Sequence, residues 1–282
     1  MIEVVELIGS ALVQDLGRPG LSHLGVSPSG AADRAALRAG NTALGNPATA
    51  AGLEVMGAIS VRVHDDLLLA VTGAPGAVTV DGVPDDGRVV PAPAGSLVAL
   101  AAPRWGLRSY LTVRGGLDVE PVLGSRATDT LSGLGPPPVQ VGDRLAVLPP
   151  AGEVPTSDPT PAPPPPGTLA MLDAAAGPRA DWLADPEQLY ARPWRVSALA
   201  DRVGTRLEGE PLLRSVTAEL PSEGVVAGSV QVPPSGEPVV LGPDHPTTGG
   251  YPVVAVLTAA ACDVLAQLRA GTTVRFRHAG PR

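Results

Sequence analysis

Residues 59–83 read ISVRVHDDLLLAVTGAPGAVTVDGV, and the pattern of this stretch decides the fold class. Residues 59–63 alternate between apolar and polar side chains, as in a half-buried strand, and residues 67–72 form a continuous apolar run. Residues 77–80 then meet Asp81 and Gly82, a dipeptide typical of a two-residue β-hairpin. The stretch therefore predicts short strands joined by tight turns.

The same pattern recurs along the chain at short, fairly regular spacing. Further β-like runs are residues 96–101, 108–113, 145–148, 230–232, 239–241, 252–257 and 272–277. The chain has 34 glycines and 33 prolines among its 282 residues, and both residue types favour turns over helix interiors. A hydrophobic share of 44% argues for a packed core. These features predict an all-β protein built from barrels or sandwiches.

Helices are predicted to be few and short. The expected helices are residues 34–44, capped by Asp33 and stopped by Gly45, residues 186–191, begun by Asp185, and residues 259–269, capped by Thr258 and closed by Gly271. We interpret all three as coverings at barrel ends.

A proline-rich segment divides the sequence. Residues 149–167 read PPAGEVPTSDPTPAPPPPG, with few large apolar side chains, so we expect an extended, solvated segment. A plain linker is favoured over a ligand for an SH3 domain, because the sequence has no other signalling feature. The predicted organisation is an N-terminal domain over residues 1–150, a linker over 151–167 and a C-terminal domain over 168–282.

All 20 residues counted as lysine or arginine are arginine. The missing lysine excludes a GxxxxGK[ST] phosphate loop, a Schiff-base lysine and a serine–lysine nucleophile pair. Anions must therefore be bound by guanidinium groups or backbone amides. The net charge of -8 and the scarcity of aromatic residues (2%) argue against binding of nucleic acid.

The single cysteine, Cys262, excludes an intrachain disulfide, and we expect it to be buried and inert. The four histidines have no metal-binding spacing, so no metal site is predicted. The first residues lack the features of a signal peptide, and the apolar residues 253–268 are interrupted by Asp263 and Gln267. These observations favour a cytoplasmic protein that does not cross a membrane.

Three Gly-rich or polar segments of the N-terminal half are candidate sites. The loop around residues 13–33 carries Gln14, Arg18 and Ser29, and Arg18 offers a fork to a carboxylate; the alternative is an ion pair between Arg18 and Asp15. Glu54, set in an apolar run, is either a base with a shifted pKa or a structural partner of an arginine.

The third segment places Arg126 after Gly124 and Ser125, an arrangement suited to an oxyanion. The alternative is a simple ion pair between Arg126 and Asp129. The sequence is compatible with both interpretations.

The C-terminal half has the most concentrated signal. Residues 244–252, DHPTTGGYP, combine the acid/base groups of Asp244 and His245 with hydroxyls, unobstructed amides and the phenol of Tyr251. Arg202 lies in a Gly-broken charged turn, where Arg206 and Glu208 are interpreted as a solvated cluster. Two ordinary hairpin turns are the alternative explanation, and a functional site is favoured.

Seven segments follow one another in the order and spacing of a known family. They are VQDLGRPG (13–20), GVSPSGAAD (25–33), LGNPATAAGLE (44–54), RGGLDVEPVLGSRATD (114–129), DRVGTRLEG (201–209), SEGVVAGSVQVPPSGEP (222–238) and DHPTTGGYP (244–252). On these segments the sequence resembles the family of 5-oxoprolinase component C, also called the KipA family, the biotin-dependent carboxyltransferase family or "allophanate hydrolase subunit 2". The resemblance extends from about residue 9 to residue 276.

The resemblance implies two cyclophilin-like β-barrel domains and a role as one subunit of a larger enzyme. Members work with a component B similar to KipI, and with a component A, in the ATP-dependent opening of 5-oxo-L-proline to L-glutamate. A related region forms the carboxyltransferase part of urea carboxylase, where carboxybiotin is the carboxyl donor. A third possibility is a non-catalytic regulatory partner of a KipI-like protein.

The resemblance also implies a site for a small amide or lactam substrate. The catalytic candidates are His245, Glu54 and Tyr251. The substrate-binding candidates are Gln14, Arg18, Ser29, Arg126, Arg202, Gln231, Thr247, Thr248, Gly249 and Gly250. We expect no tightly bound cofactor in this chain, with ATP used by the complex and carboxybiotin only under the carboxyltransferase alternative.

Overall fold

The computed structural model describes residues 1–85, 89–153 and 169–280, which form two compact units. Unit 1 comprises Met1–Arg18, Ser29–Asp129 and Gly133–Pro165. Unit 2 comprises Pro19–Pro28, Thr130–Ser132 and Pro166–Arg282. Unit 2 therefore includes two short segments that come from within the first 150 residues. The predicted linker lies almost entirely outside the described residues.

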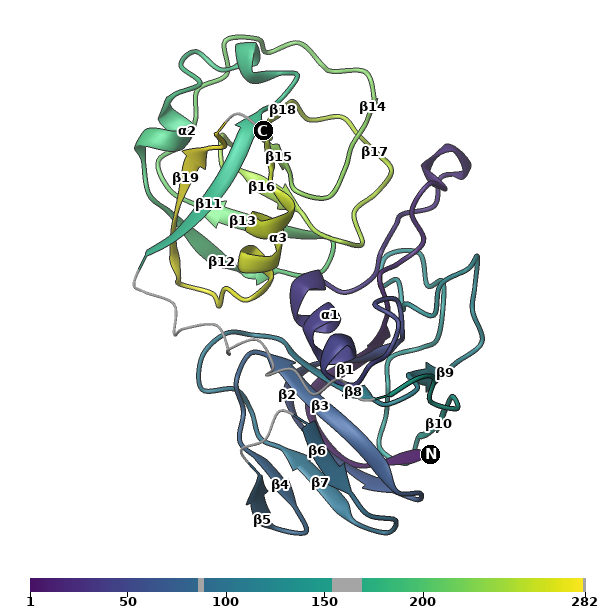
Figure 1. Cartoon of the computed structure of the whole chain (residues 1–282). Helices are drawn as coiled ribbons and strands as arrows, with labels where there is room; N and C mark the ends of the chain where they lie inside the picture. Colours follow the sequence, from purple (N-terminus) through teal and green to yellow (C-terminus); the bar gives the residue numbers. More distant parts are fainter. Residues whose placement is uncertain (86–88, 154–168, 281–282) are drawn as a thin grey trace. The chain divides into compact units, whose positions relative to one another are not determined.

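Unit 1 is built from antiparallel strands (Figure 1). They are β1 (Ile2–Gln14), β2 (Gly52–Val63), β3 (Leu67–Gly73), β4 (Val78–Val80), β5 (Val83–Asp85), β6 (Val89–Ala92), β7 (Leu97–Leu100), β8 (Ser109–Val113), β9 (Leu117–Asp118) and β10 (Arg144–Val147). The main order is β5-β4-β7-β2-β1-β10-β9, while β8 pairs with both β2 and β3, and β3 pairs with β6.

The long pairing of β1 with β2 places the first candidate residues. It runs from Ile2 opposite Val63 to Gln14 opposite Gly52. Alternate side chains of both strands enter the unit 1 core, and Val13 and Leu53 are almost fully buried. The predicted hairpin is confirmed, because β4 and β5 flank Asp81 and Gly82, which both have positive φ.

One helix packs on the strands of unit 1. It is α1 (Arg34–Ala43), and the Asp33 side chain accepts a hydrogen bond from the Ala36 N–H, as predicted for a cap. The Thr72 hydroxyl donates to the Ala36 carbonyl at 2.7 Å, which fixes the helix against β3. A Cβ at Gly40 would lie 2.7 Å from Thr112 Oγ1, so the close packing on β8 requires glycine there.

Unit 2 is a closed barrel with the order β11-β18-β15-β16-β13-β12-β19. Its strands are β11 (Leu169–Ala176), β12 (Trp194–Ala200), β13 (Gly204–Glu208), β15 (Ser229–Gln231), β16 (Val239–Leu241), β18 (Val253–Leu257) and β19 (Thr273–His278). A separate ladder joins β14 (Glu223–Gly224) to β17 (Thr248–Gly249). The barrel closes through a parallel pairing of β11 with β19 and encloses Trp194 and Phe276.

The helical elements of unit 2 are short. They are η1 (Ser22–Leu24), η2 (Ala180–Trp182), α2 (Gln188–Ala191) and α3 (Ala259–Ala266). The Thr258 cap of α3 is confirmed, but the helix ends before the predicted residue 269. The prediction that Asp185 begins α2 is wrong, because Glu187 is the N-cap residue. Asp185 Oδ1 instead accepts a hydrogen bond from the Glu187 N–H at 3.0 Å.

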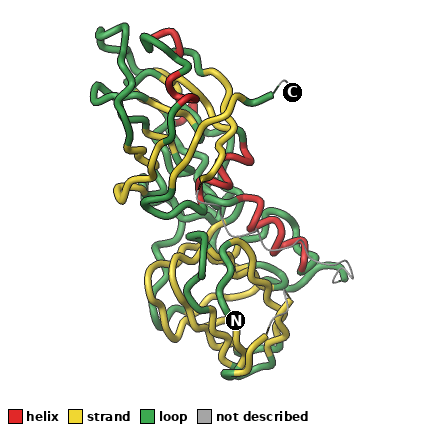
Figure 2. The backbone as a smooth tube through the Cα atoms, turned by 90° about the vertical axis from the view of Figure 1, so that its left-hand side faces the viewer, coloured by secondary structure: helices red, strands yellow, loops and turns green. Residues whose placement is uncertain are grey.

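The predicted all-β class is confirmed, since strands and loops dominate both units (Figure 2). Cys262 is half-buried rather than buried. Within the described ranges, no helix is both long and apolar enough to cross a membrane.

Candidate functional site

In unit 1, Gln14 at the end of β1 and Arg18 in the loop after it bind backbone carbonyls of the segment that follows β9. Gln14 Nε2 donates to the Thr128 carbonyl at 2.8 Å. Arg18 donates through Nη2 to the Ala127 carbonyl at 2.5 Å and through Nε to the Val122 carbonyl at 3.3 Å. The Ser29 hydroxyl also donates to the Thr128 carbonyl, at 3.2 Å. The structure therefore brings Gln14, Arg18 and Ser29 together.

Asp15 organises the loops around these residues. Its Oδ1 accepts from the Gly17 N–H at 2.7 Å and from the Ser125 hydroxyl at 2.6 Å. Its Oδ2 accepts from the Arg126 N–H at 2.7 Å. The alternative that Arg18 pairs with Asp15 is wrong for this structure, because both carboxylate oxygens bind other donors and Arg18 binds carbonyls.

Arg126 has a different environment from Arg18. Its guanidinium lies 3.8 Å from Asp118 Oδ1, and 30% of its side chain is exposed. The ion partner is thus Asp118, and the expected alternative, Asp129, is not the partner among the described residues. At this separation and exposure, the charge pair contributes little to stability.

Glu54 anchors the start of α1. Its Oε2 accepts from the Tyr110 hydroxyl at 2.7 Å and from the Ala32 N–H at 2.9 Å, while Oε1 lies 3.3 Å from Arg108 Nε. The Tyr110 hydroxyl accepts from the Asp33 N–H. Of the two interpretations of Glu54, the structural pairing with an arginine is the one that the geometry supports.

Burial of Tyr110 raises the pKa of its phenol well above 10, and the nearby carboxylates of Glu54 and Asp33 raise it further. The phenol therefore stays protonated and keeps donating to Glu54 at neutral pH. This arrangement holds a local structure and leaves the Glu54 oxygens occupied.

In unit 2, Arg202 and Asp244 form a buried, two-pronged ion pair. Arg202 Nε lies 2.8 Å from Asp244 Oδ2, and Nη2 lies 3.0 Å from Oδ1. The same Oδ2 accepts from the backbone N–H of Thr130 at 2.9 Å and from its hydroxyl at 2.7 Å. Asp244 is therefore an anchor for Arg202 and Thr130, which belongs to unit 2 although it is distant in sequence.

His245 follows this anchor and is also buried. Its Nδ1 lies 2.7 Å from the Pro246 carbonyl; because a carbonyl only accepts, we assign the proton to Nδ1. The preceding Pro243 carbonyl accepts from the Ser27 hydroxyl at 3.1 Å. These contacts fix the backbone on both sides of Asp244.

Gln231 and the glycines of the DHPTTGGYP segment lie together. Gln231 Nε2 donates to the Tyr251 carbonyl at 3.2 Å. A Cβ at Gly249 would lie 2.5 Å from Gln231 Nε2, so a larger residue there would displace the Gln231 amide. Thr248, Gly250 and Tyr251 are exposed, and Thr247 is half-buried. The segment thus presents hydroxyls and backbone amides at the surface with Gln231 behind them.

Sequence reasoning missed Asp15, Thr128 and Thr130 as parts of these arrangements. Asp15 had a usable signal, because an Asp two residues before a glycine suits a turn in which its side chain accepts a backbone N–H. Thr128 and Thr130 had none, because their roles arise from contacts with residues distant in the sequence. Among the described residues, no group of three or more His, Cys, Asp or Glu side chains could hold a metal ion.

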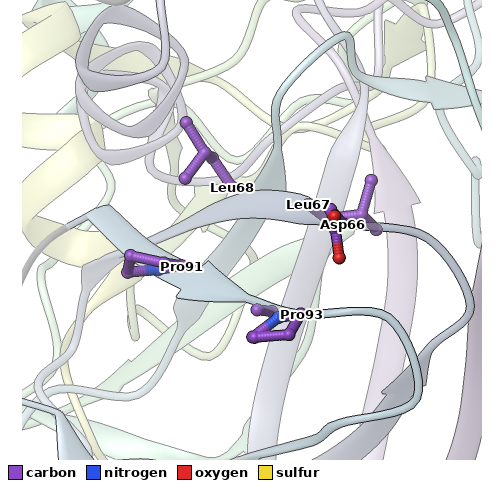
Figure 3. Close-up of a pocket in the computed structure, with 6 residues that line it drawn as sticks. Asp66, Leu67, Leu68, Pro91 and Pro93 are labelled. Carbon is purple, nitrogen blue, oxygen red and sulfur yellow. The ribbon is translucent and has the colours of Figure 1, made fainter.

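A pocket on unit 1 lies away from the candidate residues. It has a volume of about 340 Å³ and is formed by β3, β6 and their flanks (Figure 3). The lining residues are Asp66, Leu67, Leu68, Pro91, Ala92 and Pro93. Asp66 is the one charged residue of this lining, and its Oδ1 already accepts from the Ala94 N–H. The pocket therefore offers little polar chemistry.

Comparisons with known proteins give the family. The family model "Carboxyltransferase domain, subdomain A and B" matches residues 24–278. Component C of the Escherichia coli 5-oxoprolinase is 36% identical, with 98% of this chain and 90% of that protein aligned. The protein of the same name from Haemophilus influenzae is 34% identical over the same shares of the two chains.

Larger proteins contain a similar region. The urea amidolyase of Lachancea kluyveri is 26% identical over 94% of this chain, which spans 16% of that protein. The crystal structure of the Kluyveromyces lactis urea carboxylase matches 98% of this chain with a TM-score of 0.88 and 25% identity, and the match spans 27% of that chain. The chain therefore belongs to the family of 5-oxoprolinase component C, whose members are enzyme subunits with the carboxyltransferase domain, subdomain A and B.

Proposed function

We propose that this chain is component C of an ATP-dependent 5-oxoprolinase, which opens 5-oxo-L-proline to L-glutamate with one water molecule. The observation that carries this proposal is the alignment with two proteins of that name over 98% of this chain and 90% of each relative. The proposed partners are a component B similar to KipI and a component A. We expect ATP to be used by the complex and no cofactor to be bound tightly by this chain.

Each unit, taken by itself, carries groups suited to an anionic or amide ligand. In unit 1, Arg18 or Arg126 suits the carboxylate of a substrate. In unit 2, the amides of Gly249 and Gly250 and the hydroxyls of Thr247 and Thr248 suit a developing oxyanion. His245 is the proposed proton carrier, since Glu54 already accepts two hydrogen bonds and pairs with Arg108.

The remaining proposed site residues support these groups. Arg202 holds Asp244 beside His245, and Gln231 holds the backbone at Tyr251. The exposed Tyr251 phenol is available to a ligand at the surface of unit 2.

The direct test is reconstitution. The chain is co-expressed with the products of neighbouring genes that resemble components A and B, and glutamate release from 5-oxo-L-proline is measured with and without ATP. We expect ATP-dependent release that disappears when this chain is omitted. Absence of release from a mixture in which all components are soluble would contradict the proposal.

A second candidate function is carboxyl transfer from carboxybiotin to a urea-like amide. The observations that favour it are the carboxyltransferase family model and the similarity to urea amidolyase and urea carboxylase. Under this alternative a biotin carboxylase and a biotin carrier come from other chains. Biotin-dependent carboxylation of urea by a reconstituted mixture would support it, and insensitivity of the reaction to avidin would count against it.

A further inference from the structure

Several side chains of unit 1 have a buried polar atom without a hydrogen-bond partner in the described structure, and three of them bind or belong to the same stretch of backbone. The residues are Gln14, Arg18 and Thr128, which are 0%, 2% and 4% exposed. The atoms are Gln14 Oε1, Arg18 Nη1 and Thr128 Oγ1. Buried polar atoms are paired in most native structures, so three such atoms in one region require an explanation.

The three side chains are fixed to the same short stretch of backbone. Gln14 Nε2 binds the carbonyl of Thr128 itself, and Arg18 Nη2 binds the carbonyl of the preceding residue, Ala127. The Cα atoms of neighbouring residues are about 3.8 Å apart, so the two carbonyls belong to adjacent points of the backbone. A single small molecule therefore has the size needed to contact all three side chains.

The charge of this region indicates the kind of molecule. Arg18 binds two neutral carbonyls and has no carboxylate partner among the described residues. The nearby carboxylate of Asp15 is occupied by Gly17, Ser125 and Arg126. A buried guanidinium without a counter-charge is unfavourable, and an anion would relieve this.

We propose that these residues form a buried subsite for a small carboxylate that carries an N–H group on its α-carbon. Arg18 Nη1 and Thr128 Oγ1 donate hydrogen bonds to the carboxylate. Gln14 Oε1 accepts one from the N–H. Donors beside an acceptor match such a molecule and do not match chloride or sulfate, which have no hydrogen to donate.

The proposal rests on the proposed function, because 5-oxo-L-proline is a carboxylate of this class. It selects Arg18 rather than Arg126 as the arginine that binds the substrate carboxylate. Each arginine has one nitrogen without a hydrogen-bond partner among the described residues, but Arg126 is 30% exposed and faces Asp118, whereas Arg18 is buried and binds only neutral carbonyls. It also adds Thr128, which lies in the segment 114–129 but was not singled out there as a site residue. The competing explanation is a buried water that serves all three atoms.

The test compares two threonine variants of the full chain. Thr128→Val removes a hydroxyl that has no partner, so the ligand-free protein should melt at the same temperature or higher. Thr112→Val is the matched control: Thr112 is also buried in unit 1, but its hydroxyl donates to the Ala70 carbonyl at 3.3 Å, so this variant should melt lower.

Binding of 5-oxo-L-proline is then measured by calorimetry with the chain alone, and its KM is measured with the assembled complex. We expect Thr128→Val to weaken binding or raise KM about tenfold or more, as for loss of a hydrogen bond to a charged group, and Thr112→Val to leave both unchanged. The carboxamide of 5-oxoproline and its N-methyl derivative should also bind at least about tenfold more weakly than the parent.

Specific outcomes would overturn the subsite. These are an unchanged affinity and KM in Thr128→Val, equal binding of the carboxamide, no binding to either the chain or the complex, or a ligand-soaked crystal that shows only water at Arg18. Glutamate release with an unchanged KM in Thr128→Val would reject the subsite and leave the proposed function standing. Binding that depends on Thr128, without glutamate release in any reconstitution, would support the subsite and contradict the proposed function.

Discussion

The ion pair between Arg202 and Asp244 gives the sharpest stability prediction. In Asp244→Asn the side chain keeps its shape but loses its charge, and one of its oxygens becomes an amide donor. At either oxygen position that donor would face a nitrogen of the Arg202 guanidinium, and at the Oδ2 position it would also face the Thr130 N–H, and these groups are themselves donors. The substitution therefore leaves a buried charge uncompensated and at least one donor without an acceptor.

The magnitude follows from burial. Asp244 is 0% and Arg202 is 4% exposed, and breaking a buried pair from one side costs about 3–5 kcal/mol. A domain is stable by only about 5–15 kcal/mol, so this is a large share of the stability of unit 2. For a unit of this size, the unfolding temperature should fall by roughly 10–20 °C.

The assay is urea unfolding followed by Trp fluorescence and circular dichroism, fitted with separate transitions for the two units if they do not coincide. All three tryptophans of the chain can report on the transitions, and Trp194 lies in the unit 2 core. Glu208→Gln is the matched control, because its pair with Arg195 lies in the same unit but is exposed, and it should have little effect.

A double variant separates the pair from its surroundings. Asp244→Leu combined with Arg202→Met removes both charges, so it should cost less than the sum of the two single substitutions. The reasoning would be refuted if Asp244→Asn destabilised the protein no more than Glu208→Gln, or if the two single costs simply added.

Three further predictions concern the two units. Gly9→Ala should lower the stability of unit 1 by more than about 3 kcal/mol, because its Cβ would lie 2.0 Å from a carbonyl oxygen of β2. Gly95→Ala is the control, because its Cβ would have no atom within 4 Å and would cost only the strain of a positive φ. Tyr110 has a raised pKa when folded, so its stabilising effect is complete below about pH 10 and is lost as the pH rises through the folded-state value; Tyr110→Phe should flatten this alkaline decline. Thr130→Val should lower the stability of unit 2 by about 1.5–3 kcal/mol through loss of its hydroxyl bond to Asp244.

Each of these predictions has a defined failure. Equal unfolding free energies for Gly9→Ala and Gly95→Ala would show that β1 and β2 relax without cost. A Tyr110→Phe protein whose stability declines between about pH 9 and pH 12 as steeply as the parent would show that another group titrates. For Thr130→Val, an unchanged midpoint in urea would show that water replaces the hydroxyl.

Local pattern was sufficient for part of the fold. The Asp81–Gly82 hairpin and the caps Asp33 and Thr258 were predictable, because each depends on the conformational preference of adjacent residues. The strands β3 and β16 were predictable because most of their residues are apolar.

Other strands carry no clear local signal. β1 contains a stretch of exposed and half-buried residues in its middle and is held by pairing with β2 along most of its length. β11 is rich in alanine, a residue with low strand propensity, and its place is fixed by pairing with β18 and β19. Tertiary pairing therefore decides these strands.

The site was predictable only as a set of segments. The Gly-rich loops indicated Gln14, Arg18 and Arg202, but their partners are carbonyls or carboxylates that lie far away in the sequence. Asp15 accepts hydrogen bonds from three residues of the surrounding loops, and the Thr128 hydroxyl has no partner among the described residues. Both features follow from packing alone.

Unit 2 contains two segments from the first half of the chain, and this affects how the protein folds during synthesis. Pro19–Pro28 and Thr130–Ser132 leave the ribosome well before the barrel strands that they join. The backbone N–H and the hydroxyl of Thr130 can form their hydrogen bonds to Asp244 only after Asp244 has been translated. We therefore expect unit 2 to complete its folding only near the end of translation, and cleavage at the proline-rich segment during synthesis to yield a C-terminal fragment that lacks part of its own structure.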